Sequence, residues 1–336
     1  MRNGSILLLA LLATLPYVGA NATQLTDAKV IQASAASGLE NAVGQIASAA
    51  EKPLWIAWDV PAADPRSQMC CFQSIGDGEK HHWKGGSCSL TDGNSFFSSH
   101  SAGKPSTPIP DTDTFTIFLR AQNGKVDQLR TFSAGCHVDA AGSTVHRFTG
   151  VSASESVFYL TRLLDLIGAQ PDSKSGREEE RQHVIGAIAS IRSTNAIPAL
   201  TAVVRSRRPQ EIRGQAAFWL GMRGGDEGRS VLLSLLDSPA AGRRTDGQRD
   251  GQLDDLMEQA VAGIAQDDSS AATAALLSLA KRNKAPAIRK RAIFWLGQKA
   301  GERATADLKE AAGDADEEVQ EMAVFSISQL PKARAI

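Results

Sequence analysis

The second half of the chain, residues 178–336, carries apolar residues at the spacing of amphipathic α-helices. Side chains three and four positions apart lie on one face of a helix, so this spacing predicts helices that each bury one side. The clearest stripes, which we expect to form the core, are Ile212, Ala216, Trp219 and Leu220 in one stretch and Ile288, Ala292, Trp295 and Leu296 in another. Most stripes are followed by a polar turn and a second apolar helix, as at 197–204 and 231–236. The predicted unit is therefore a helix pair.

These helix pairs form an internal repeat. Residues 211–221 and 287–297 share Ile-Arg, Ala and Phe-Trp-Leu-Gly at identical offsets. The position of the shared alanine recurs in five units, at Val184, Ala216, Ala260, Ala292 and Ala323. Most intervals are about 32 residues long, and one longer interval contains a Gly-, Arg- and Asp-rich insertion at 238–251. Neither helix of a pair can bury its stripe alone, so we expect about five pairs to stack into a solenoid.

Residues 21–150 show a mixed pattern, which is typical of a small α+β domain. The clearest local signal is a hairpin, because strand-like runs at 113–120 and 125–132 flank Asn-Gly at 123–124, a preferred pair for a tight turn. The other expected elements are a short strand at 28–32, a helix at 38–50, a strand at 54–60, a polar loop at 89–112 and a second hairpin of 136–138 with 144–148.

Ser152 and Glu155 mark the start of a further helix. We expect Ser152 to cap it while Glu155 reaches back to the backbone of Ser152. The helix ends near Gly168, and a polar linker follows at 170–177. The predicted fold class is thus an α+β N-terminal domain followed by an all-α helical-repeat solenoid. The expected segments are a signal peptide at 1–20, the α+β domain at 21–150, a capping helix and linker at 151–177, and the repeats at 178–336.

The N-terminal segment has the pattern of an export signal. Arg2 supplies a positive charge, residues 6–15 form an apolar run, and residues 18–20, Val-Gly-Ala, fit the small-x-small cleavage pattern. The run is too short to span a bilayer; an uncleaved anchor is the alternative interpretation. We therefore expect a periplasmic or secreted protein that does not insert into a membrane after signal cleavage.

The charges of the chain nearly balance. There are 36 basic and 37 acidic residues, which give a net charge of −1. This balance gives no support for a nucleic acid as the partner, because such proteins carry an excess of basic residues. We expect the partner to be a protein.

Four cysteines, an even number, suggest disulfides in an exported chain. They are Cys70, Cys71, Cys88 and Cys136. A bridge between adjacent Cys70 and Cys71 would be strained, which leaves two pairings. The shorter loop favours Cys71–Cys88 with Cys70–Cys136. The alternative is a metal site that combines cysteines with the histidines His81, His82, His137 and His146, although adjacent cysteines are awkward for chelation.

Motifs of common enzymes are missing from the sequence. It has no Gly-x-Ser-x-Gly, no His-Glu-x-x-His and no phosphate-binding glycine loop. We therefore expect no catalytic residues, no cofactor and no metal, and a protein that is not an enzyme.

The repeats resemble the HEAT-like repeat family, in the bacterial short-repeat form that also occurs in phycobilin lyase subunits. The resemblance rests on a first helix of the form Val/Ile-Arg-x-x-Ala-x-x-x-Leu-Gly, at 212–221 and 288–297, and extends over about 178–330. It also makes the chain similar to exported bacterial HEAT-repeat proteins. Arg213 and Arg289 match the recurring arginine of this family, which implies bonds to carboxylates or carbonyls of neighbouring loops.

These features together predict an exported protein-interaction or scaffold module that binds through the surface formed by the second helix of each pair. The alternative function is a metal-binding protein or a hydrolytic enzyme with its site in the cysteine-containing domain. A resemblance of fold alone does not decide between them.

Overall fold

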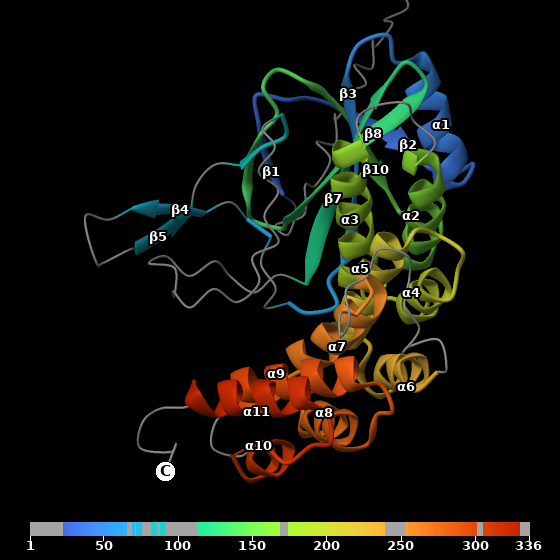
Figure 1. Ribbon diagram of the computed structural model, residues 1–336. Helices are drawn as coiled ribbons and strands as arrows, with labels where there is room; N and C mark the ends of the chain where they lie inside the picture. The colour runs from blue at the N-terminus through green and yellow to red at the C-terminus, as the bar shows by residue number, and fades with distance from the viewer. Residues whose placement is uncertain are drawn as a thin grey trace, which may run out of the picture.

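The computed structural model describes residues 23–65, 69–70, 72–75, 82–85, 88–91, 113–168, 174–238, 253–300 and 305–329 (Figure 1). Its strands are β1 (Gln24–Thr26), β2 (Lys29–Ser34), β3 (Leu54–Pro61), β4 (Phe72–Ile75), β5 (His82–Gly85), β6 (Cys88–Ser89), β7 (Thr114–Gln122), β8 (Lys125–Ser133), β9 (His137–Asp139) and β10 (Thr144–Thr149). Its helices are α1 (Leu39–Ala49), α2 (Ala153–Gly168), α3 (Lys174–Ser190), α4 (Ala196–Val204), α5 (Gln210–Arg223), α6 (Gly225–Leu236), α7 (Asp255–Gln266), α8 (Ser270–Arg282), α9 (Pro286–Ala300), α10 (Thr305–Ala311) and α11 (Glu317–Ser328). The expected signal segment and most of the 89–112 and 238–251 loops lie outside the described residues.

Five strands form the central sheet, in the order β2-β10-β3-β7-β8. Strand β10 runs parallel to both β2 and β3, whereas β7 runs antiparallel to β3 and to β8. The predicted hairpin is confirmed. Its turn residues Asn123 and Gly124 have φ angles of 52° and 76°, the left-handed values that a tight two-residue turn requires.

The second predicted hairpin, of 136–138 with 144–148, is wrong. Strand β9 pairs with β1 and β6 in a separate three-stranded sheet, while β10 lies between β2 and β3. Val138 of β9 and Val145 of β10 both belong to the apolar layer that separates the two sheets. The intervening turn therefore carries the chain from one layer to the other instead of folding it back on itself.

Strands β3 and β7 of the central sheet are buried on both faces, whereas the edge strand β2 is largely exposed. Trp58 and Ile117 lie on the face that packs against α1 and α2 and belong to the apolar core there, in which the Trp58 indole N–H donates to Ser156 Oγ at 2.9 Å. Trp55, Phe118 and Phe132 lie on the opposite face, in a second apolar cluster that also contains the described cysteines. A strand that is buried on both sides is apolar almost throughout, which explains the composition of β3.

Glu155 caps a different helix from the expected one. Ser152 Oγ accepts a hydrogen bond from the Glu155 N–H at 3.1 Å, as the capping pattern predicts. The Glu155 carboxylate, however, accepts from the Leu39 N–H at 2.6 Å, so it caps α1. The expected bond back to Ser152 is replaced because Gly38, which precedes α1, has no side chain that could cap that helix. The substitute cap ties α1 to α2.

Helix α3 joins the sheet to the repeats. It begins at Lys174, within the segment expected to be a linker. Glu180 accepts from the N–H of Leu129 at 2.8 Å and pairs with Arg130 at 3.0 Å, so α3 covers the β8 edge of the sheet. At its other end, the carbonyl of Ser190 accepts from the N–H of Ala63 at 2.8 Å, just beyond β3.

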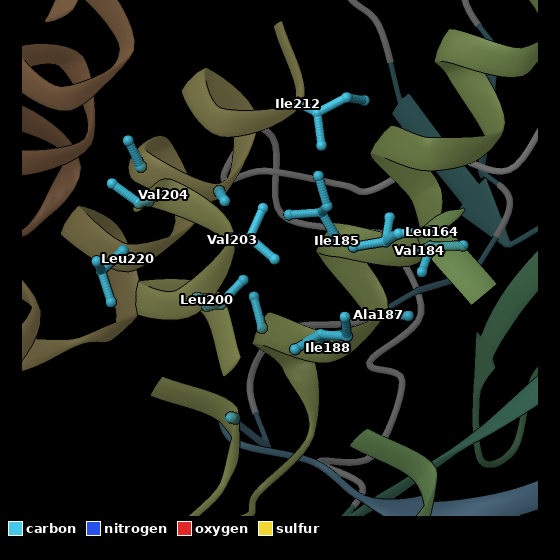
Figure 2. Packing of buried hydrophobic residues seen from close by; sticks show 14 of the residues in the cluster. Leu164, Val184, Ile185, Ala187, Ile188, Leu200, Val203, Val204, Ile212 and Leu220 are labelled. Atoms are coloured by element: carbon cyan, nitrogen blue, oxygen red, sulfur yellow. The ribbon is translucent and has the colours of Figure 1, made fainter. Parts of the chain in front are cut away.

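The helices from α3 onward stack as pairs. Helices α3, α5, α7, α9 and α11 form a first row, in which neighbours contact each other, and α4, α6, α8 and α10 form the second row (Figure 1). Helix α2 contacts both α3 and α4, so it extends the second row towards the sheet. Figure 2 shows how Leu164 of α2, Ile185 of α3 and Val203 of α4 meet. One apolar core runs from α1 and the sheet through α2 and α3 to α11.

Candidate functional site: the faces of the helix array

Each of the helices α3, α5, α7 and α9 has one side that faces the following first-row helix, and we call this side, together with its counterpart on α11, the forward side. Relative to the shared alanine, it contains the residues two before, one after and five after, which fall within one sector at 3.6 residues per turn. The forward-side residues are Gly214, Ala217 and Gly221 in α5, Glu258, Val261 and Ala265 in α7, Lys290, Ile293 and Gly297 in α9, and Glu321, Val324 and Ser328 in α11. The contacts below show what each forward side receives.

The forward side of α5 is made of small residues, and α7 lies very close to it. A Cβ atom added to Gly221 would lie 2.4 Å from the carbonyl carbon of Gly263. A Cβ atom added to Gly214 would lie 2.7 Å from a carboxylate oxygen of Asp255. The absence of side chains at these positions therefore allows the two helices to pack backbone against backbone.

The forward side of α7 receives basic residues of α9. Arg291 forms an ion pair with Glu258. About two turns further along α9, the Lys299 ammonium donates to the carbonyl oxygen of Ala265 at 2.6 Å. This carbonyl lies near the C-terminus of α7, where carbonyls lack helical partners. Trp295 lies between these two residues at helical spacing, so Arg291, Trp295 and Lys299 share one side of α9.

The forward side of α9 packs against α11. A Cβ atom added to Gly297 would lie 2.7 Å from the Cβ atom of Ser326, so this contact also depends on a small residue. Lys290 pairs with Glu318 at 2.6 Å. The contact between α9 and α11 thus repeats the close approach of α5 to α7 and adds one ion pair.

The forward side of α11 is exposed. Val324 is 58% exposed, whereas the equivalent Ala217, Val261 and Ile293 are each 0% exposed under the next repeat. The adjacent Phe325 is 48% exposed. Apolar side chains of α11 are therefore exposed at a position that is buried in α5, α7 and α9.

The recurring arginines bond to neighbouring loops, as the resemblance implies. The Arg213 Nε donates to the carbonyl oxygen of Val204, at the end of α4, at 2.8 Å. Arg289 donates two hydrogen bonds to the Asp314 carboxylate, at 3.0 and 2.7 Å, and one to the carbonyl oxygen of Asn283. This fork lowers the pKa of Asp314, because hydrogen bonds from Arg289 favour the ionised carboxylate. Both arginines connect consecutive pairs of the array.

The expected core residues divide into two groups. Six of them are 2% exposed or less: Ile212, Ala216, Leu220, Ile288, Ala292 and Leu296. Trp219 and Trp295 are only half-buried and pack against the core from its edge. The Nε1 of Trp295 is buried and has no hydrogen-bond partner in the described part of the chain. The tryptophans therefore lie at the edge of the stripe and not at its centre.

A buried polar cluster lies between β8 and α3. Arg130 and Glu180 form its ion pair, and His183 lies 3.6 Å from the Glu180 carboxylate. Burial alone would raise the pKa of Glu180, but the neighbouring His183, the charge of Arg130 and the hydrogen bond from the Leu129 N–H together lower it. The sequence contained no signal for this cluster, because its β8 residues and its α3 residues are 50 or more positions apart and follow no motif.

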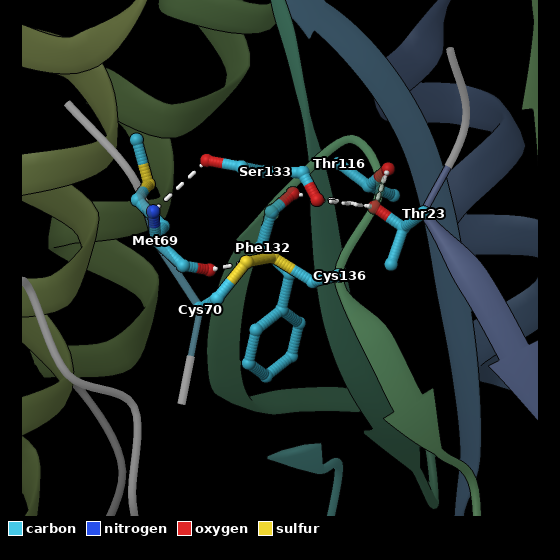
Figure 3. Close-up of a disulfide and its surroundings, with 7 residues drawn as sticks. All are labelled: Thr23, Met69, Cys70, Thr116, Phe132, Ser133 and Cys136. Atoms are coloured by element: carbon cyan, nitrogen blue, oxygen red, sulfur yellow. Dashed lines mark hydrogen bonds between the residues drawn. A yellow bond between two sulfur atoms is a disulfide. The ribbon is translucent and has the colours of Figure 1, made fainter. Parts of the chain in front are cut away.

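The cysteines lie in the second apolar cluster. Cys70 and Cys136 form a disulfide with a Cα–Cα distance of 5.6 Å, beside Met69, Phe132 and Ser133 (Figure 3). Cys88 is also disulfide-bonded, and Cys71 lies outside the described residues. Bridged cysteines have no thiolate to offer, so Cys70, Cys88 and Cys136 are not available as metal ligands.

The histidines of the metal alternative do not gather around these bridges. His137 is exposed, and His146 is half-buried on β10, where burial lowers its pKa. His81 and the side chain of His82 lie outside the described residues. Within the described residues, no group of three or more His, Cys, Asp or Glu side chains could hold a metal ion.

The second-row helices present a face of small and polar residues. Exposed positions on this face include Pro198 and Ala202 of α4, Ser230 and Ser234 of α6, and Ala274 and Ser278 of α8. A cavity of about 210 Å³ lies between α8, α9 and α10. Its charged residues are already paired, since Lys281 contacts Asp307 at 2.9 Å and Glu310 at 2.8 Å.

None of the helices in the described ranges is long and apolar enough to cross a membrane.

In comparisons with known proteins, the chain is similar to solved structures at low identity. No protein-family model matches the chain, and no curated protein matches it. Among solved structures, the complex of CpcE and CpcF of phycocyanin lyase from Nostoc sp. PCC7120 is 15% identical, with a TM-score of 0.31; the match covers 55% of this chain and 66% of that one, just under two thirds of its length. Human deoxyhypusine hydroxylase is 17% identical with a TM-score of 0.22, over 53% and 79% of the two chains. An engineered protein is 18% identical with a TM-score of 0.27, over 51% and 78%.

Proposed function

We propose that this protein is an exported protein-interaction module that binds a partner through the second row of its helix array. The observation that carries the proposal is the array itself, in which stacked helix pairs align exposed faces of α4, α6 and α8 over successive repeats. Small side chains on these faces lose little conformational entropy when a partner covers them. The bond from α3 to the sheet edge and the shared core support the array as a rigid platform.

Export is part of the proposal. The disulfide between Cys70 and Cys136 is buried in the domain that precedes the array, and disulfides persist in oxidising compartments. The predicted signal segment at 1–20 agrees with this location.

Affinity capture from an envelope extract, with chemical cross-linking and mass spectrometry, tests the binding surface. The double variant Ser234→Arg/Ser278→Arg places two long cations on the exposed faces of α6 and α8 and should abolish capture. The matched control is Lys125→Glu, at the exposed start of β8, which is outside the second row of helices. Capture that persists in the double variant, or is lost in the control, would contradict this surface.

Metal analysis separates the competing function. A metal-binding protein or hydrolase centred on the cysteines would retain stoichiometric zinc after dialysis. We expect the purified oxidised protein to retain none, because each of its three described cysteines is bridged. Retained zinc would favour the competing function.

A further inference from the structure

We propose that the forward side of α11 is a docking site for an amphipathic helix of a partner protein. This helix carries an arginine or lysine, a large apolar residue four positions later, and a second basic residue eight positions later. The inference rests on the proposed function, since it adds the kind of partner segment that the array accepts.

The first observation is the exposed apolar position at the end of the row. Val324 and Phe325 lie on α11, where no further helix of the described chain covers them. The equivalent residue of α7, Val261, is fully buried against the following repeat. In the array this position is therefore a contact for another helix.

The second observation is that α11 repeats the forward side of α7. Glu321, Val324 and Ser328 stand where α7 has Glu258, Val261 and Ala265. No other described helix of the row has this combination, because α5 has glycines there and α9 has a lysine. The chain itself thus shows which helix such a side binds, namely α9.

The contacts of α9 define the chemistry of the partner. Arg291 pairs with Glu258, Lys299 donates to the carbonyl of Ala265, and Trp295 lies between them. A partner helix on α11 would place its first basic residue at Glu321 and its apolar residue over Val324. Its second basic residue would reach the carbonyls at the C-terminus of α11, where the helix dipole favours a cation.

Charge favours a basic helix over a second copy of this chain. Glu317 and Glu321 lie on the exposed side of α11, and residues 314–329 contain no lysine or arginine. Within the described residues, Glu321 has no ion-pair partner. Two copies of α11 would bring like charges together, which is unfavourable at an interface, whereas a cationic helix is complementary.

The test uses the α9 sequence itself as the probe. A fluorescent peptide of residues 286–300, acetylated and amidated at its ends, is titrated with the full protein, and its fluorescence anisotropy is measured. We expect saturable binding that Glu321→Lys weakens about tenfold. Val324→Lys should weaken it at least as much. Glu51→Lys, the same charge change at an exposed site next to α1, should leave it unchanged.

A charge exchange gives the sharpest outcome. A peptide with Arg291→Glu should bind the unaltered protein weakly and should recover affinity for the Glu321→Lys protein. Recovery requires the two charges to meet, and a general loss of structure could not produce it. The variants should keep the circular dichroism spectrum of the unaltered protein.

Three outcomes would overturn the proposal. The first is no binding, or binding that ignores both Glu321→Lys and Val324→Lys. The second is binding that arises only in the Lys332→Glu/Arg334→Glu variant, which would assign the site to the chain's own C-terminal residues. The third is a dimer in sedimentation experiments that Val324→Lys dissociates, which would assign the site to a second copy. Capture that depends on Ser234 and Ser278 would stand in all three cases, so the two proposals fail separately.

Discussion

Gly221 of α5 and Gly263 of α7 lie face to face, and neither has room for a Cβ atom. A Cβ on Gly221 would lie 2.4 Å from the Gly263 carbonyl carbon, and one on Gly263 would lie 2.5 Å from the Phe218 carbonyl oxygen. The two helix backbones therefore touch at this crossing. The spacing of the array at its centre depends on these two residues.

We predict that Gly221→Ala destabilises the protein by about 1–3 kcal/mol, because the added methyl group forces α5 and α7 apart. The control is Gly44→Ala in α1, where no atom lies within 4 Å of the added Cβ. Alanine stabilises an open helical position by about 0.5–1 kcal/mol relative to glycine. Urea unfolding measures both. Equal effects of the two changes would contradict the close contact.

The sequence predicted where the first-row helices lie along the chain better than it predicted the contacts between them. Apolar spacing and the shared Phe-Trp-Leu-Gly located α5 and α9, because their cores follow the helical period. The glycine that ends this motif could be recognised as recurrent, but not as a contact, because its partner at 263 belongs to a weaker repeat copy. Neighbours across helices are not encoded by spacing within one helix.

The buried pair Arg130–Glu180 should behave as a unit. Their side chains are 4% and 11% exposed, so Glu180→Gln leaves Arg130 as an unpaired buried charge. We expect a loss of about 3–5 kcal/mol. The double variant Arg130→Leu/Glu180→Leu leaves no charge behind and should lose less than the two single leucine variants together. A double-mutant cycle from urea unfolding decides this, and additive losses would show that the pair is not coupled.

Trp295 should contribute less than a fully buried tryptophan. Because the ring is half-buried, we expect Trp295→Ala to cost roughly 2–3 kcal/mol, below the 3–5 kcal/mol that is typical of complete burial. Trp295→Phe should cost about 1 kcal/mol or less, because it also removes a buried N–H that has no described partner. Thermal and urea unfolding measure both. A phenylalanine variant as unstable as the alanine variant would show that the N–H is needed.

Asp314 should make the repeats sensitive to acid. Hydrogen bonds from Arg289 hold the pKa of Asp314 below its ordinary 3.8. A lowered folded-state pKa means that the stabilisation is complete above pH 3.8 and is lost as the pH falls through the lowered value. Asp314→Asn should therefore reduce stability at neutral pH and flatten the decline between about pH 5 and pH 2. Glu51→Gln, at an exposed site, serves as the control; an unchanged acid slope in Asp314→Asn would contradict the pair.

In the sheet domain, sequence patterns predicted local structure but not the contacts between distant segments. The Asn-Gly hairpin was predictable because its turn and both strands are local. The pairing of β10 between β2 and β3 joins segments more than 80 residues apart, and no local pattern specifies it. Glu155 illustrates the same limit, since a capping pattern with Ser152 was visible but the bond to Leu39 was not. Such pairings between distant strands and helices depend on how the whole sheet and its covering helices pack together.

The disulfides give the last prediction. Cys70 and Cys136 are bridged over a sequence separation of 66, and Cys88 is bridged as well, so we predict that its partner is Cys71. A loop of this size stabilises the folded state by roughly 2–4 kcal/mol, because the bridge restricts the unfolded chain. Ordinary peptide mapping does not distinguish the pairings, since Cys70 and Cys71 are adjacent and remain on one tryptic peptide.

A single-cysteine variant resolves this ambiguity. In the Cys136→Ser variant, the cysteine that was bridged to residue 136 becomes a free thiol, while the other bridge stays intact. Alkylation under non-reducing conditions, followed by fragmentation between positions 70 and 71, should place the label on Cys70, because it is Cys70 that lies 5.6 Å from Cys136 between their Cα atoms. A label on Cys71 would establish the opposite pairing. Four alkylated cysteines in the unaltered exported protein would remove both bridges and return the thiolates to the metal-binding alternative, because only unbridged cysteines can ligate zinc.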